Sequence, residues 1–93
     1  MSDREQLLAE LRPTAFAIAY RMLGSVSEAE DIVQEALLRV HQALEGGEEL
    51  SSPHAFVATI TTRLAINELR SARARRERVR RGVAARADHH RRR

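Results

Sequence analysis

The sequence predicts an all-α fold, a three-helix domain followed by a disordered basic C-terminal tail. Apolar residues recur at helical spacing in three separate stretches, each bounded by serine, glycine or proline residues that start or stop helices. No stretch shows the apolar–polar alternation of a β-strand, and no internal repeat is present. A length of 93 residues allows one small domain of modest stability.

The first helix is predicted to end at Leu23. Pro13 falls within it, and two interpretations stay open: Pro13 occupies the first turn of a short helix, or it bends a longer one. Gly24 and Ser25 supply the stop signal that follows. The apolar face consists of Leu7, Leu8, Leu11, Ala15, Ile18, Ala19 and Met22.

The second helix has the clearest boundaries. Ser27 is a good N-cap residue, and Glu30 stands three residues later, which is the spacing of a capping box. Gly46 and Gly47 end the helix. Its apolar stripe consists of Ile32, Val33, Ala36, Leu37, Val40 and Leu44.

The third helix follows a polar loop at residues 45–52. Ser51 or Ser52 is predicted to cap it, with Pro53 in its first turn. Ile66 and Leu69 lie off the main apolar stripe, which predicts that this helix is covered on more than one side. The apolar periodicity fades past Arg70, and disorder is predicted from Arg80. The residues predicted to face the core are Phe56, Val57, Ile60 and Leu64.

Composition excludes several classes of protein. The chain has no cysteine, which rules out a disulfide framework and a thiolate metal site. No apolar run is long enough for a signal peptide or a membrane span, so we expect a bacterial cytoplasmic protein that does not bind membranes. All 16 basic residues are arginine, which suggests a GC-rich genome.

Charge is divided unevenly along the chain. Residues 1–69 hold five arginines and eleven acidic residues, a net charge of −6, whereas residues 70–93 hold eleven arginines and two acidic residues, a net charge of +9. An acidic body with a basic end predicts two different partner surfaces. A solvated tail on an ordinary helical domain explains the same charges, and both interpretations stay open on charge alone.

One candidate surface is an acidic face on the second helix. Asp31, Gln34, Glu35 and Leu38 follow the spacing i, i+3, i+4 and i+7, and Arg39 flanks them. Spacing alone favours a solvated helix face, because exposed charged faces are common. The functional interpretation is a docking surface for a basic helix, with Leu38 as an apolar anchor among polar contacts.

A second candidate surface is a basic stripe on the third helix. Arginine with threonine and asparagine on one face could contact both phosphates and base edges of nucleic acid. An arginine-rich helix end in solvent is an equal alternative. Tyr20 is predicted to lie in the core with Phe16 and Phe56 rather than to stack on a base. The stripe comprises Thr59, Arg63, Ile66, Asn67 and Arg70, followed by Arg73, Arg75, Arg76 and Arg78.

Signals for catalysis or metal binding are weak. The four histidines form neither an HExxH motif nor a helical pair, and no glycine-rich phosphate loop is present. The serines are explained by caps and turns. We therefore predict no catalytic residue, no metal site and no cofactor.

Two segments resemble a known family. RMLGSVSEAEDIVQEALLRVHQAL (residues 21–44) resembles region 2.2 of sigma-70-type factors, and AFVATITTRLAINELRSARARRE (residues 55–77) resembles regions 2.3–2.4. The resemblance covers about residues 5–77 and is nearest to extracytoplasmic-function factors that carry a C-terminal SnoaL-like domain. It implies a sigma region 2 domain at residues 1–78, with residues 79–93 as the tail.

The resemblance implies partners for both candidate surfaces. In such factors the D-x-x-Q-E face docks on the clamp helices of the polymerase β′ subunit, which implies this role for Asp31, Gln34 and Glu35, with Leu38 and Arg39 beside them. The last helix meets the non-template strand of the −10 element and the upstream duplex, which implies DNA contacts for Arg63, Asn67, Arg70, Arg73, Arg75 and Arg76. The preceding loop captures a flipped base; here it consists of Glu45, Gly46, Gly47, Glu48, Glu49, Leu50, Ser51, Ser52, Pro53 and His54.

The chain departs from the family pattern at several positions. Many members have Trp at Phe56, Asn at Arg63 and Asp at Asn67, so promoter specificity is not carried over. Region 4, which reads the −35 element, and the SnoaL-like domain have no counterpart in this sequence. When suitable synonymous GC-rich codons are chosen for residues 79–92, a one-base frame shift yields a string similar to the linker Y-V-G-x-W-L-P-E-P of the subgroup, which suggests an out-of-frame tail on a truncated product.

Three functions follow as hypotheses. The first is a sigma region 2 module that binds core polymerase and −10 promoter DNA. The second is a regulatory or non-functional fragment that occupies polymerase or an anti-sigma factor. The third is a helical protein with a basic tail that binds nucleic acid nonspecifically.

Overall fold

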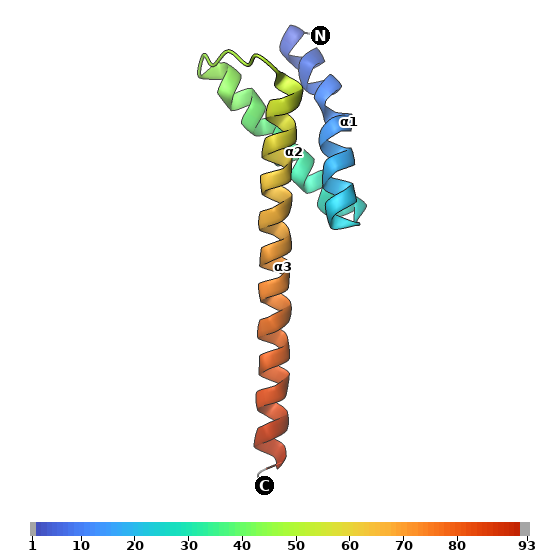
Figure 1. Cartoon of the computed structure of the whole chain (residues 1–93), viewed down its shortest axis with the longest axis vertical. Helices are drawn as coiled ribbons and strands as arrows, with labels where there is room; N and C mark the ends of the chain where they lie inside the picture. Colours follow the sequence, from blue (N-terminus) through green and yellow to red (C-terminus); the bar gives the residue numbers. More distant parts are fainter. Residues whose placement is uncertain (1, 92–93) are drawn as a thin grey trace.

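The computed structural model describes the backbone of residues 2–91 and the side-chain environment of residues 2–83. It contains three helices: α1 (Asp3–Leu23), α2 (Val26–Glu45) and α3 (Pro53–Arg91) (Figure 1). No strand occurs within residues 2–91, so the all-α, three-helix prediction is confirmed. None of the helices described is long and apolar enough to cross a membrane.

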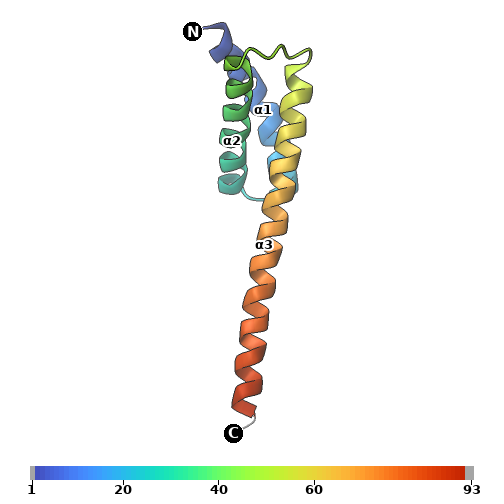
Figure 2. The ribbon, with the colours of Figure 1, turned by 90° about the vertical axis from the view of Figure 1, so that its left-hand side faces the viewer.

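The helices form a bundle at one end of an elongated molecule. α1 and α3 run in roughly the same direction and α2 runs back between their ends, as two perpendicular views show (Figures 1 and 2). Each helix packs against both others. Because α3 continues well past the bundle, the molecule measures 68 × 24 × 20 Å.

The junction between α1 and α2 differs from the prediction. Gly24 adopts φ 69°, a left-handed conformation that favours glycine, and its N–H donates to the Tyr20 carbonyl oxygen at 2.8 Å. Ser25, not Ser27, is the N-cap of α2, and its Oγ accepts from the Glu28 N–H at 3.4 Å. The sequence holds two overlapping Ser-x-x-Glu patterns, and the left-handed turn at Gly24 places the first one at the helix start.

The other helix boundaries follow the sequence signals. α1 begins at Asp3, so Pro13 lies inside the longer of the two helices considered. Ser52 caps α3, because its Oγ accepts from the Ala55 N–H at 3.2 Å, and Pro53 occupies the first helical position. Gly46 ends α2 as predicted.

The core consists largely of small and branched side chains. Phe16, Phe56, Ile60 and Leu64 are half-buried and pack against it, which agrees with the prediction for α3. Several buried positions are alanine, so the helices approach closely and the apolar area buried on folding is limited. The central cluster consists of Leu11, Ala15, Val33, Ala36, Leu37, Val40 and Val57.

Three apolar residues are more exposed than predicted. Tyr20 is 46% exposed and stacks on Phe16 with a ring-centroid separation of 5.8 Å, so it covers the edge of the core rather than filling it. Ile66 and Leu69 are 36% and 40% exposed. The prediction that this part of α3 is covered on more than one side is therefore wrong for the described residues, in which α1 and α2 leave Ile66 and Leu69 partly open to solvent.

The basic tail continues α3. Disorder is predicted from Arg80, whereas the backbone is helical through Arg91. Glu77 pairs with Arg73 at 3.6 Å and with Arg81 at 3.8 Å, and such i, i+4 pairs add only tenths of a kcal/mol. The C-terminal part of α3 extends away from α1 and α2 in both views (Figures 1 and 2). Disorder of this segment in solution stays a prediction.

One buried polar group has no hydrogen-bond partner. The side chain of Thr61 is 0% exposed, and its Oγ1 meets no donor or acceptor among the described residues. A buried hydroxyl without a partner costs about 1–3 kcal/mol. We therefore predict that Thr61→Val raises the free energy of unfolding by about 1 kcal/mol, measured by urea denaturation followed by circular dichroism.

Thr62→Val is the matched control. The Thr62 Oγ1 donates to the Ala58 carbonyl oxygen at 2.8 Å, so removing this hydroxyl relieves no unpaired group. Equal stabilisation by both substitutions would show that valine acts through general apolar burial instead.

Candidate functional site

The predicted docking residues lie on one outward side of α2, which we call the α2 face: Asp31, Gln34, Glu35, Leu38 and Arg39. Asp31 and Gln34 are exposed, Glu35 is half-buried, and Leu38 is 48% exposed. The opposite side of the helix is buried in the core through Val33 and Val40. Packing therefore fixes which side of α2 is presented to solvent.

A carboxylate and a guanidinium pair on this face. Arg39 Nε donates to Glu35 Oε1 at 3.1 Å, across one helical turn. Both side chains are about half exposed, and pairs of this kind contribute about 0–1 kcal/mol. Glu35 is thus held in place but can exchange Arg39 for a cation on a partner at small cost.

A groove between α1 and α2 adjoins the α2 face. It has a volume of about 610 Å³ and is lined mainly by apolar surface from both helices. The prediction from the sequence placed a docking face on α2 alone and missed the contribution of α1 to this groove. The adjacent Leu7 and Leu8 were the available signal, because two neighbouring leucines make the apolar stripe of α1 wider than contact with one helix requires. The lining residues are Glu5, Leu8, Ala9 and Arg12 from α1, and Gln34, Leu37, Leu38 and His41 from α2.

The predicted base-capturing segment is partly helical. Glu45 ends α2, while Pro53 and His54 already belong to α3, so the connecting loop itself is residues 46–52. Gly47 has φ 85°, and the Glu48 N–H donates to the Ala43 carbonyl oxygen at 3.1 Å, which turns the chain back at the helix end.

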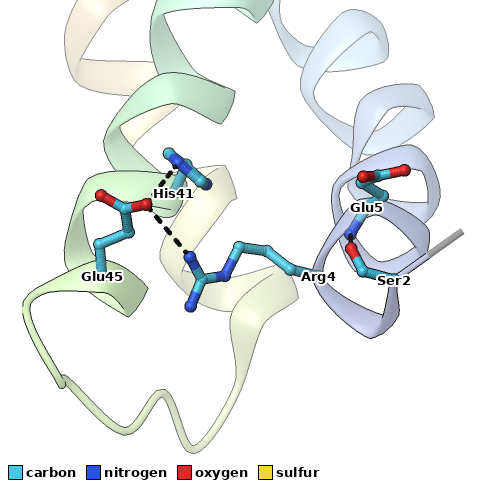
Figure 3. A network of polar contacts seen from close by, with 5 residues as sticks. All are labelled: Ser2, Arg4, Glu5, His41 and Glu45. Atoms are coloured by element: carbon cyan, nitrogen blue, oxygen red, sulfur yellow. Dashed lines mark hydrogen bonds and ion pairs between the residues drawn. The ribbon is translucent and has the colours of Figure 1, made fainter.

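Contacts at both ends hold this loop in place. Glu45 Oε1 accepts from Arg4 Nη1 at 3.5 Å and lies 3.2 Å from His41 Nε2, so one carboxylate joins the start of α1 to the end of α2 (Figure 3). Further along, Leu50 packs against the core. At the start of α3, His54 Nδ1 lies 3.5 Å from Thr14 Oγ1.

The loop and the first turns of α3 enclose a second groove, which we call the loop groove. Its volume is about 460 Å³. It brings the predicted loop together with Arg63, the first of the predicted DNA-binding residues. Glu49, Leu50, Ser51 and Ser52 line it from the loop, and Ala55, Phe56, Thr59, Ile60 and Arg63 line it from α3.

The predicted DNA-binding residues of α3 do not form a single group. Arg63, Asn67 and Arg70 are exposed at the spacing i, i+4 and i+7, which places them on one side of the helix. Arg75 and Arg76 instead line an open groove with Glu28 of α2, and Arg75 also pairs with Glu68 at 3.3 Å. Arg73 pairs with Glu77. The structure therefore does not gather the six predicted DNA-binding residues into one site.

No metal centre is indicated in the described part of the chain. Among those residues, no group of three or more His, Cys, Asp or Glu side chains could hold an ion. The functional features that the fold positions are the α2 face with its adjoining groove, the loop groove and the arginines of α3.

Comparison with known proteins gives a consistent family. The model of sigma-70 region 2 matches residues 7–75. The ECF RNA polymerase sigma factor SigJ of Mycobacterium tuberculosis is 43% identical over 67 residues, which is 72% of this chain and 20% of the relative. SigG of the same species is 41% identical over 64 residues, 69% of this chain and 17% of the relative.

A more distant relative comes from another organism. The ECF RNA polymerase sigma factor SigW of Bacillus subtilis is 36% identical over 55 residues, 59% of this chain and 29% of the relative. The chain thus spans between 17% and 29% of the length of these relatives. No solved structure matches the chain significantly. None of these names specifies the subgroup with a SnoaL-like domain, so that assignment stays a prediction.

The ion pair at the root of the loop gives a testable prediction. We expect Arg4→Ala to speed backbone hydrogen exchange in residues 46–52, because Glu45 loses its link to α1. The free energy of unfolding should change by less than about 1 kcal/mol, since the pair is exposed. Hydrogen-exchange mass spectrometry measures the first quantity and urea denaturation the second.

Arg12→Ala provides the control for that experiment. It removes a comparable pair between α1 and α2, to Glu30 at 3.6 Å, and Arg12 does not touch the loop root. Equal acceleration of exchange in residues 46–52 by both variants would show that the loop responds to general loosening of the bundle.

Proposed function

Because the chain belongs to the sigma-70 region 2 family, we propose that it binds core RNA polymerase and holds melted promoter DNA during transcription initiation. The observation that carries this proposal is the exposed α2 face, on which Asp31, Gln34 and Glu35 lie together beside an apolar groove. Its occupant in this proposal is a basic helix, which we identify with the clamp helices of the polymerase β′ subunit.

The α2 face has the features of such an interface. Asp31 makes no ion pair among the described residues, so its carboxylate is free for a partner cation. Leu38 and Leu8 give the interface an apolar centre within a polar rim. Charge complementarity steers the encounter, whereas burial of the leucines supplies affinity.

Promoter DNA is proposed to bind on α3 and the loop. Arg63 and Arg70 supply charge for phosphates near the loop groove, and the groove receives a base of the non-template strand of the −10 element. Unstacking a base costs a few kcal/mol, which contacts in the groove offset. The reaction step of this chain is binding; nucleotide addition belongs to the polymerase, in the cytoplasm.

A second function uses the same α2 face. The chain occupies polymerase, or an anti-sigma factor that recognises this face, without starting transcription. The supporting observation is that the α2 face and its groove are complete within residues 5–41 and need no contact from the DNA-binding side. Transcription assays with core polymerase separate the two functions, because only the first yields a promoter-dependent transcript.

The docking proposal predicts the effect of charge reversal. Asp31→Arg combined with Glu35→Arg should weaken binding to core polymerase at least about tenfold, since two attractive contacts become repulsive. Biolayer interferometry with immobilised core polymerase measures the affinity, and circular dichroism verifies the fold.

The control reverses two acidic side chains elsewhere. Glu10→Arg with Glu77→Arg changes the net charge by the same amount and leaves the α2 face intact. A loss of affinity that is equal in both double variants would mean that net charge, not the α2 face, determines binding.

A further prediction concerns the free chain and DNA. Without polymerase we expect weak, nonspecific binding, with a dissociation constant of about 10⁻⁴–10⁻⁶ M near physiological salt, because arginine–phosphate contacts carry no sequence information. Affinity should fall steeply with salt, and removal of residues 79–93 should reduce both the affinity and its salt dependence. Fluorescence titration with matched and scrambled −10-like oligonucleotides measures these effects; strong discrimination by the free chain would contradict the prediction.

A further inference from the structure

Glu49 lines the loop groove, and the proposed function does not use this residue. We propose that Glu49 selects the base that enters this groove and favours bases with an exocyclic amino group (cytosine, adenine or guanine) over thymine. The inference rests on the proposed function, because it assumes that the groove receives an unstacked base.

The floor of the groove suits a nucleobase. Leu50, Phe56 and Ile60 line it and are half-buried against the core, so the floor is apolar and held in place by packing. Apolar and aromatic surfaces stack on the face of any base, whatever its sequence. The groove is open to solvent, and its volume is about 460 Å³. The floor therefore supplies affinity without choosing among bases.

Any preference for one base over another has to come from the polar residues that line the groove. Two of these residues are charged, and they belong to different segments. Glu49 belongs to the loop and Arg63 to α3. Neither makes an ion pair or a side-chain hydrogen bond with another described residue, so both are available to a ligand. A guanidinium only donates and a carboxylate only accepts, so the two groups read opposite features of a base.

Arg63 discriminates little among bases. All four carry at least one ring or carbonyl acceptor, and phosphates on either side of the base are stronger acceptors still. Its guanidinium is therefore expected to hold the strand in the groove. The choice of base then depends on Glu49, whose carboxylate accepts hydrogen bonds.

The carboxylate of Glu49 separates thymine from the other bases. Cytosine, adenine and guanine each present an amino group on the pairing edge, which donates to a carboxylate. Thymine presents a single N–H between two carbonyl oxygens, and a carboxylate placed against that edge faces like charge on both sides of its one donor. An unpaired or repelled polar group in a partly desolvated groove loses affinity.

The other acidic residues of the segment lack this position. Glu45 is engaged by Arg4 and His41 at the root of the loop (Figure 3). Glu48 precedes Glu49 directly but does not line the groove. Among the described residues of this loop, Glu49 is thus the one acidic residue that lines the loop groove.

Selection of oligonucleotides tests the inference without knowledge of the promoter. The full chain bound to core polymerase is offered a single-stranded DNA pool that is randomised over a −10-sized window, and the bound fraction is sequenced. We expect one position at which thymine is depleted about tenfold. In Glu49→Gln this depletion should disappear, because the amide N–H₂ can donate to thymine carbonyls. Glu10→Gln, which makes the same charge change on α1, should leave the selected sequences unaltered.

The outcomes separate the inference from the proposed function. Sequence enrichment with an unchanged thymine depletion in Glu49→Gln overturns the role of Glu49 but leaves promoter binding in place. Loss of the depletion in Glu48→Gln to the same extent as in Glu49→Gln also overturns it, since loop charge would then explain the effect. No enriched position with any version, although the chain remains bound to core polymerase, overturns the proposed −10 contact itself. Circular dichroism and core-binding affinity of each variant verify that the chain is intact.

Discussion

The close approach of three helices through small side chains is the constraint on which the structure depends. Ala15, Ala36 and Ala65 are fully buried where the helices meet, and a larger side chain at any of them would separate two helices. With few large residues in the core, little apolar area is available to compensate for such a separation. The orientation of α2, and therefore the direction in which its acidic face points, follows from this packing. The functional surfaces are consequently sensitive to core substitutions that they do not touch.

The same packing explains the arrangement of polar contacts at the surface. Arg12–Glu30 and Arg4–Glu45 join α1 to α2 at exposed positions, where each pair contributes little energy. Their effect is to hold local geometry, most clearly at Glu45, where the loop begins. The bundle supplies stability, and the exposed pairs fix the segments that a partner would meet. Asp31 and Glu49 make no intramolecular ion pair among the described residues.

Much of the fold could be predicted from the sequence, because the apolar periods and the caps at Ser52 and Gly46 agree with the tertiary packing. Ser25 could not be distinguished from Ser27 as the cap of α2, since both begin a Ser-x-x-Glu pattern and only the turn at Gly24 decides between them. The exposure of Tyr20 depends on where α2 and α3 lie, which local pattern does not specify. Helical spacing predicted that the residues of the α2 face share one side of α2. The α1 side of the adjoining groove and the separation of Arg75 from Arg63 depend on how the three helices assemble. The assigned partners of these residues remain predictions.

Because α3 is one continuous helix, it sets both the distance between its arginines and the direction in which each of them points. The same uninterrupted helix carries Arg63 at the loop groove and Arg80 further along, and a rise of about 1.5 Å per residue separates them by roughly 25 Å. That length corresponds to about seven nucleotide steps at 3.4 Å each. In the proposed promoter complex, the length of α3 would therefore set the spacing between a base in the loop groove and phosphates near Arg80. Inserting a single residue between the two points would lengthen this spacing only slightly but would turn the arginines beyond the insertion by about 100° around the helix axis, away from the strand in the proposed complex.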